Sequence, residues 1–189
     1  MSGIGSGKAH SSDPVSLLKK GHKARQEERL EDARAAYEMA VNLARTFGDT
    51  ALLAEAVMLV GKIERDLGET EAAIEHYQEA AALIRSLGDP LALAHTIRHV
   101  ADILREAGRV ELAGPYYDEA LILYRGNAGA RPLDVANALR GAALLKADTG
   151  HVKTAIALWR EAGVLYEQVG VAAGVDESRR QIARLSSVG

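Results

Sequence analysis

The feature that most constrains the fold is a pattern that returns about every 40 residues. A turn position recurs at spacings of 40, 40 and 42 residues, at Glu28, Gly68, Gly108 and Gly150. An alanine and an aromatic residue follow each turn, as Ala33 and Tyr37, Ala73 and Tyr77, Ala113 and Tyr117, and Ala155 and Trp159. A small residue stands seven positions before each turn, and this column comprises Gly21, Gly61, Ala101, Ala143 and, in a fifth partial copy, Ala183. Columns that recur together indicate repeated structural units.

Each unit is predicted to contain two helices. Apolar residues between the columns fall at helical spacing, as in the series Leu53, Val57, Val60 and Leu67. The residues between units also agree with the prediction of helices. Gly88 suits a left-handed helix end, Asp89 a following N-cap, and Pro90 the first helical position, where its missing N–H costs nothing. The stretch TFGDT makes a similar break at residues 46–50.

These columns resemble the tetratricopeptide repeat (TPR), over about residues 14–186. The period of 40–42 exceeds the usual 34 and is most similar to that of kinesin-light-chain repeats. The resemblance implies an all-α, right-handed solenoid of four antiparallel helix pairs followed by a C-terminal capping helix. The small and aromatic columns are then packing residues, because closely crossing helices leave no room for long side chains.

The expected division places a flexible tail or tag at residues 1–13 and a single TPR domain at 14–189. The repeats are expected at about 14–49, 50–89, 90–130 and 131–171, with the capping helix at about 174–186.

Composition excludes several kinds of function. The chain has no cysteine, so disulfides, thiolate metal sites and cysteine nucleophiles are ruled out. A formal net charge of -3, with one Trp, one Phe and six Tyr, disfavours nucleic-acid binding through a basic field or stacked bases. No apolar run approaches the roughly 18 residues of a membrane span, and no secretory leader is visible, so we expect a cytoplasmic protein without membrane contact.

The resemblance implies that the first helix of each pair lines a concave groove. Its expected lining residues are Lys62, Arg65, His95, Arg98, His99, Asp102, Arg105, Asn137 and Arg140. Arginines dominate this set, with Arg65, Arg98, Arg105 and Arg140 as expected anchors, which favours a peptide ligand with acidic residues. The alternative is that these charges solvate a helix face and pair with one another.

The stretch HTIRH, residues 95–99, has the histidine spacing of a zinc protease, with Thr96 where that motif has its glutamate. Asp102, one turn beyond His99, completes a conceivable His-His-Asp metal cluster. The other reading makes both histidines ordinary groove residues. They would then bind an acidic ligand more tightly as the pH falls through about 6.5.

The sequence therefore favours a non-catalytic module that binds a protein or peptide, without a metal or cofactor. One alternative is a segment of a larger protein that binds its own chain or self-associates. For such self-association, Val15, Leu17 and Leu18 on the first helix are the residues expected to be exposed. A metal-dependent enzyme using His95 and His99 is the remaining alternative.

Overall fold

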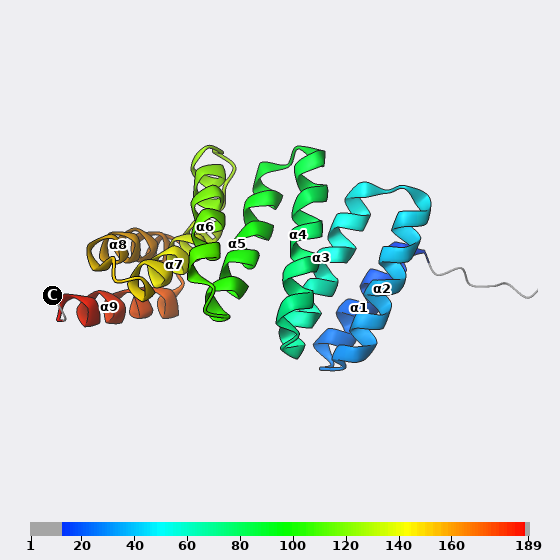
Figure 1. Ribbon diagram of the computed structural model, residues 1–189, viewed down its shortest axis with the longest axis horizontal. Coiled ribbons are helices and arrows are strands. Elements are labelled where there is room, and N and C mark those ends of the chain that lie inside the picture. The colour runs from blue at the N-terminus through cyan, green and yellow to red at the C-terminus, as the bar shows by residue number, and fades with distance from the viewer. Residues whose placement is uncertain (1–12, 188–189) are drawn as a thin grey trace, which may run out of the picture.

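The computed structural model describes residues 13–187, and every regular element in that range is an α-helix (Figure 1). The pairs are α1 (Pro14–Gln26) with α2 (Leu30–Phe47), α3 (Thr50–Leu67) with α4 (Thr70–Leu87), α5 (Pro90–Glu106) with α6 (Val110–Arg125), and α7 (Pro132–Asp148) with α8 (Val152–Gln168). A final helix, α9 (Ala172–Ser186), packs against α8. The predicted all-α solenoid of four pairs and a C-terminal helix is confirmed. Residues 1–12 of the expected tail lie outside the described residues.

The helix ends follow local sequence signals. Gly88 ends α4 with a φ of 72°, and the Asp89 carboxylate accepts the N–H groups of Leu91 and Ala92 at 3.1 and 2.9 Å. The predicted helix end, N-cap and first-turn proline are thus confirmed. The turn between α1 and α2 differs from the others, because Glu28 adopts a φ of 58° where later pairs have glycine. None of the helices within residues 13–187 combines the length and apolar character of a membrane span.

The helices form two layers. Each helix packs on the next one in the chain, and α5 also contacts α7 directly. Side chains of the odd-numbered helices reach one another, for example in the Arg65–Glu106 ion pair between α3 and α5. The even-numbered helices are joined in the same way, as by Arg45 and Glu79 of α2 and α4. The odd helices therefore make one face of the solenoid and the even helices the other.

The repeated aromatic residues fill the space between the layers. Tyr37, Tyr77, Tyr117 and Trp159 are all 0–2% exposed. A Cβ atom added at Gly21 would lie 2.3 Å from the ring of Tyr37, so only glycine fits there. The same holds at Gly141, where an added Cβ would lie 2.5 Å from Tyr117 of the preceding pair. Aromatic packing thus fixes the close approach of these helices.

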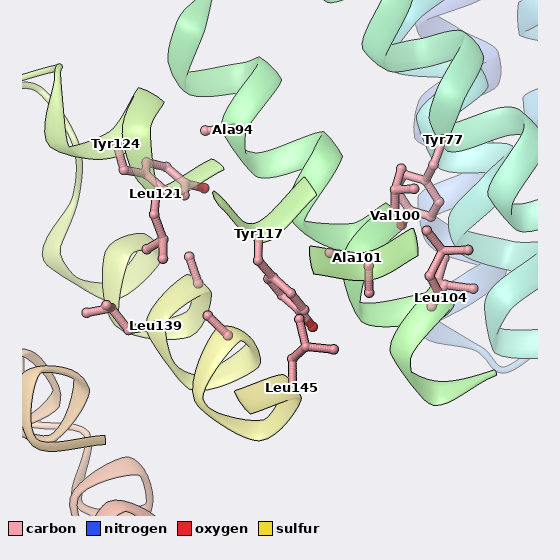
Figure 2. Packing of buried hydrophobic residues seen from close by; sticks show 14 of the residues in the cluster. Tyr77, Ala94, Val100, Ala101, Leu104, Tyr117, Leu121, Tyr124, Leu139 and Leu145 are labelled. Carbon is pink, nitrogen blue, oxygen red and sulfur yellow. The ribbon is translucent and has the colours of Figure 1, made fainter. Parts of the chain in front are cut away.

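The core continues across the longer joint between the third and fourth pairs. In Figure 1 the helices α7 to α9 lie at a steep angle to the pairs before them, and this change of direction follows the 126–131 loop. Leu121 and Tyr124 of α6 nevertheless share one buried cluster with Leu139 of α7. Figure 2 shows Leu121, Tyr124 and Leu139 in the region where α6 and α7 come together. The bend therefore occurs within a continuous apolar core.

The first helix is better covered than expected. Leu17 and Leu18 are only 3% and 4% exposed, because they pack on α2 and α3 in a second apolar cluster. Val15 alone of the three residues is open, with 48% of its surface exposed. The predicted exposure on α1 is therefore wrong for two of the three residues. This removes the main reason to expect self-association.

Candidate functional site

We call the surface shared by the odd-numbered helices the inner face. It is joined by ion pairs that cross from each odd helix to the next, Arg25–Asp66, Arg65–Glu106, Arg105–Asp148 and Arg140–Glu177. Each partner lies 37–43 residues from its arginine in the sequence. The predicted groove residues are spread along this face, on α3, α5 and α7.

His99 is the centre of a largely buried polar cluster on the inner face. Its ring stacks on Tyr77, with centroids 5.3 Å apart and an interplanar angle of 26°. Nη2 of Arg98 lies 2.9 Å from its Nε2, and Nη1 of Arg65 lies 3.4 Å from its Nδ1. A guanidinium group can only donate, whereas a neutral imidazole has only one accepting nitrogen. The ring can therefore satisfy one arginine fully, and the shorter contact identifies that arginine as Arg98.

This environment keeps both histidines of the HTIRH stretch neutral. Burial lowers the pKa of His99 to about 2, reinforced by the charge of neighbouring Arg98. Burial, followed by the same arginine, also lowers the pKa of His95. The expectation that these rings gain a charge near pH 6.5 and then attract an acidic ligand is therefore wrong. The cause is desolvation beside fixed positive charge.

Asp102 is fully engaged within the protein. Its Oδ2 accepts from Nη1 of Arg98 at 2.6 Å, and its Oδ1 accepts from the Tyr117 hydroxyl at 2.7 Å. Arg98 itself is only 9% exposed. Burial raises the pKa of Tyr117, and the Asp102 charge raises it further, so the phenol remains a donor. Asp102 thus joins α5 to α6 instead of opening onto solvent.

The side chains of the HTIRH stretch pack α5 against its neighbours and do not point toward a common metal position. Thr96, in the place of a protease glutamate, is fully buried and donates to the carbonyl of Ala92 at 2.8 Å. The His95 and His99 rings meet edge to face, with centroids 4.7 Å apart. Within residues 13–187, no group of three His, Asp or Glu side chains could hold a metal ion.

Each arginine predicted as an anchor already faces a carboxylate. Arg65 donates to both oxygens of Glu106 at 2.9 Å, and Arg140 donates to those of Glu177 at 2.7 and 2.8 Å. Arg105 lies 3.2 Å from Asp148, and Arg98 is held by Asp102 as described above. The sequence placed these charges on the correct helices but did not reveal their partners.

The two remaining predicted groove residues differ from each other. Asn137 accepts the hydroxyl hydrogen of Tyr166 at 2.8 Å, which joins α7 to α8. Lys62 does not take part in the ion pairs found within residues 13–187, and burial, followed by the charge of Arg25, lowers its pKa. Lys62 is therefore the predicted groove cation whose charge is least compensated.

A cavity of about 540 Å³ opens where the beginnings of α3, α5 and α7 meet the end of α4. Its wall is mostly apolar and includes Ala51, Ala54, Met58, Leu87, Leu91 and Ala92. His95 and Thr96 form part of the same wall, so one of the predicted groove residues lines the cavity. We call this feature the inner cavity.

The charged residues of the inner cavity are mainly acidic. They comprise three carboxylates, from Glu55, Asp89 and Asp134, and the guanidinium of Arg131. Asp134 accepts from Arg131 at 2.7 and 3.0 Å, and Asp89 caps α5. Glu55 is exposed and takes part in none of the ion pairs found within residues 13–187. The cavity therefore presents an apolar wall beside one uncompensated negative charge.

The sequence did not reveal the inner cavity. Apart from His95, the predicted residues follow the middle and end of each odd helix, whereas the cavity lies at the helix beginnings. The available signal was a group of small residues, Ala51, Ala54 and Ala92, at positions where longer side chains would fill the space. These small residues can be recognised as the wall of a cavity only when the positions of the neighbouring helices are known.

A model of the family described as soluble NSF attachment protein, SNAP, matches residues 14–188. A comparison with curated protein sequences finds no match.

Several solved structures have a similar fold at low sequence identity. Aspartyl phosphate phosphatase F from Bacillus subtilis superposes with a TM-score of 0.81 at 14% identity, over 89% of this chain and 44% of the phosphatase. MamA gives a TM-score of 0.67 at 21% identity, over 86% of this chain and 84% of MamA. A Podospora anserina protein described as a kinesin light chain with nearly identical TPR-like repeats gives 0.75 at 13%, over 92% and 84%. The chain thus spans less than half of the phosphatase, and these likenesses show a TPR-like helical-repeat fold.

Proposed function

Since the chain belongs to the soluble NSF attachment protein family, we propose that it is a protein-interaction scaffold that holds a peptide segment of a partner against its inner face. The family description names attachment proteins, which is consistent with such a role. Helical-repeat families of this type are generally scaffolds without catalytic activity of their own, and we propose the same for this chain. The segment would lie across α3, α5 and α7.

The observation that carries this proposal is the inner cavity. Its volume of about 540 Å³ falls within the roughly 300–1,000 Å³ of typical ligand pockets. Its wall combines apolar side chains with a few charged groups, the composition that allows a pocket both to bind and to select. Three helix pairs contribute to it, so a bound segment would contact residues from Ala51 to Asp134.

The predicted preference for an acidic segment finds less support than the binding itself. An acidic ligand would have to displace Glu106, Asp148 and Glu177 from the arginines that they already hold. Exchanging one carboxylate for another gains little free energy, because the arginine must first lose its existing partner and the incoming carboxylate its hydration. The proposed ligand is therefore a peptide segment for which acidic residues are not required.

The likeness to a phosphatase supports no catalytic proposal. At 14% identity over less than half of that enzyme, it speaks for the shared fold alone. Self-association through the same inner face is a distinguishable outcome of the experiment below. A segment of a longer parent chain would be another occupant of that face.

The experiment compares proteins captured from cell lysate by three immobilised forms of the chain. Ala51→Trp places an indole in the inner cavity, and Ala51 is exposed, so the substitution does not disturb the core. Ala82→Trp is the matched control, the same change at an exposed position of α4, away from the cavity. Captured proteins are identified by mass spectrometry, and light scattering gives the mass of each bait.

The expected result is a protein retained by the wild type and by Ala82→Trp but lost with Ala51→Trp. Capture of the same proteins by all three baits would contradict the use of the inner cavity. A wild-type bait with twice the monomer mass that becomes monomeric with Ala51→Trp would identify a second copy as the occupant. Thermal melting of each variant checks that the fold is retained.

A further inference from the structure

The charges around the inner cavity restrict what it can bind. Of the four lining residues that carry a charge, three are acidic and only Arg131 is basic. Arg131 is already bound by Asp134, and the two carboxylate oxygens accept from its Nε and Nη2. The lowered pKa of His95 leaves that ring neutral. No positive charge on the wall is therefore available to attract an acidic group.

Glu55 is the exception among the acidic residues. Asp89 is stabilised by two backbone N–H groups at the beginning of α5, and Asp134 by its arginine. Glu55 has neither kind of partner among the contacts found in residues 13–187, and it is exposed at the edge of the cavity. A cation brought to this position would gain a charge-assisted hydrogen bond without breaking an existing one.

The volume of the inner cavity indicates how many side chains it can take. An apolar cavity of roughly 150 Å³ holds one benzene-sized group. The inner cavity measures about 540 Å³, so it has room for at least two apolar side chains. Met58, Leu87 and Leu91 supply an apolar wall for them.

We propose that the inner cavity binds a basic apolar segment of a partner protein. Two neighbouring apolar side chains of that segment enter the cavity, and an adjacent Lys or Arg pairs with Glu55. This inference rests on the proposed function and specifies its ligand. It also reverses the charge preference suggested by the row of arginines, because those arginines are occupied and the carboxylate of Glu55 is not.

A peptide-display selection tests the proposal. Random twelve-residue peptides are selected on the wild-type chain, the enriched sequences are read, and each enriched peptide is then tested for binding to Ala51→Trp. The strongest peptide is then synthesised with a fluorescent label, and its affinity is measured by anisotropy. The protein variants are Glu55→Lys and the control Glu75→Lys, which makes the same charge change at an exposed residue of α4 away from the cavity.

The expected peptides contain two or more apolar residues beside a Lys or Arg. Glu55→Lys should weaken their binding about tenfold, because it removes the close ion pair with the basic residue of the peptide. Glu75→Lys should change it by less than about twofold, because Glu75 lies away from the cavity. Replacing the basic residue of the peptide by Glu should restore affinity for Glu55→Lys.

The outcomes separate this inference from the proposed function. Acidic peptides that depend on the inner cavity would overturn the charge preference and leave the scaffold proposal intact. An equal effect of Glu55→Lys and Glu75→Lys would likewise overturn the role of Glu55. Peptides that bind Ala51→Trp as well as the wild type, or no enrichment at all, would contradict both.

Discussion

The two layers of the solenoid use the same kind of ion pair in different ways. On the even-numbered helices, an arginine of one pair meets a glutamate of the next in a regular series, Arg45–Glu79, Arg85–Glu119 and Arg125–Glu161. On the inner face the corresponding series is interrupted. Ala147 stands where α7 would carry the next arginine, and Arg140 pairs with Glu177 of α9 instead.

The difference extends to burial. The side chains of the outer series are 38–55% exposed. On the inner face the side chains of the corresponding series are 19–50% exposed, and only within α5 are the side chains of a pair, Arg98 and Asp102, as little as 11% and 16% exposed. Their neighbours His95 and His99 occur on α5 alone, without histidine at the corresponding positions of α3 or α7. The outer surface is therefore both solvated and regularly repeated. The buried cluster and the inner cavity lie where the repeat pattern is interrupted.

The largest expected effect is the loss of the buried pair. Asp102→Ala leaves the hydroxyl of Tyr117 without its acceptor and the guanidinium of Arg98 without a carboxylate, so that Arg98 keeps only the neutral ring of His99. We expect the free energy of unfolding to fall by about 3 kcal/mol, the usual consequence of stranding a buried charge. Glu119→Ala is the matched control from the outer series, where the loss should stay below about 1 kcal/mol.

Chemical denaturation at pH 7 measures both variants. Equal losses for the inner and the outer carboxylate would show that the two layers do not differ in the way that burial indicates. Asp102→Asn keeps an acceptor oxygen and should lie between Asp102→Ala and the wild type.

The second prediction concerns acid stability. The pKa of His99 is about 2 in the folded chain, below the ordinary value of about 6.5 that applies after unfolding. Between these values the unfolded chain binds a proton that the folded chain does not, so stability falls as the pH falls below 6.5. The slope attributable to this one group is about 1.4 kcal/mol per pH unit.

His99→Gln should remove that slope, and His151→Gln, at an exposed position before α8, serves as its control. The groups around His99 are, from α3, α4 and α5, Lys62, Arg65, Tyr77, His95, Arg98 and Asp102. Stability is measured by denaturation at intervals from pH 7 to pH 5. An unchanged slope in His99→Gln would contradict the neutral buried ring.

These contrasts also explain what the sequence could and could not predict. Helix ends were predictable at Gly88 and Asp89 because one residue type suffices to favour each conformation. The packing columns were predictable because an aromatic residue such as Tyr37 needs a small residue opposite, and both recur. Such features depend on residues within one helix pair, where the chain itself keeps the partners close.

Pairing on the inner face was not predictable in the same way. Whether Arg105 meets Asp148 or solvent depends on how one pair is rotated against the next, and no local pattern records that rotation. The inner cavity depends on three pairs at once, since Ala51 and Asp134 are 83 positions apart in the sequence. The sequence thus identified the face on which the inner cavity lies but not the position of that cavity.

The third prediction concerns the turn that joins the two layers. Glu28 has a φ of 58°, whereas the same turn of later pairs uses Gly68, Gly108 and Gly150. A residue with a Cβ atom is strained in this conformation, so Glu28→Gly should raise the free energy of unfolding by about 1 kcal/mol. Glu75→Gly, inside α4, should lower it by a similar amount. Thermal melting of both variants measures the difference, and a destabilised Glu28→Gly would contradict the strain.

The smallest expected effect lies in the outer series itself. Arg85 and Glu119 are 55% and 41% exposed, so water competes for both groups and their side chains lose rotational freedom on pairing. A double-mutant cycle with Arg85→Ala and Glu119→Ala should give a coupling free energy of about 0.5 kcal/mol or less, which 1 M salt should remove. A coupling above about 2 kcal/mol that persists in salt would mean that the outer series fixes the curvature of the solenoid as firmly as the buried cluster does. A weak, screened coupling instead leaves the outer pairs free to exchange with solvent, so that the shape of the inner face is set by the packed aromatic residues and by the buried Arg98–Asp102 pair.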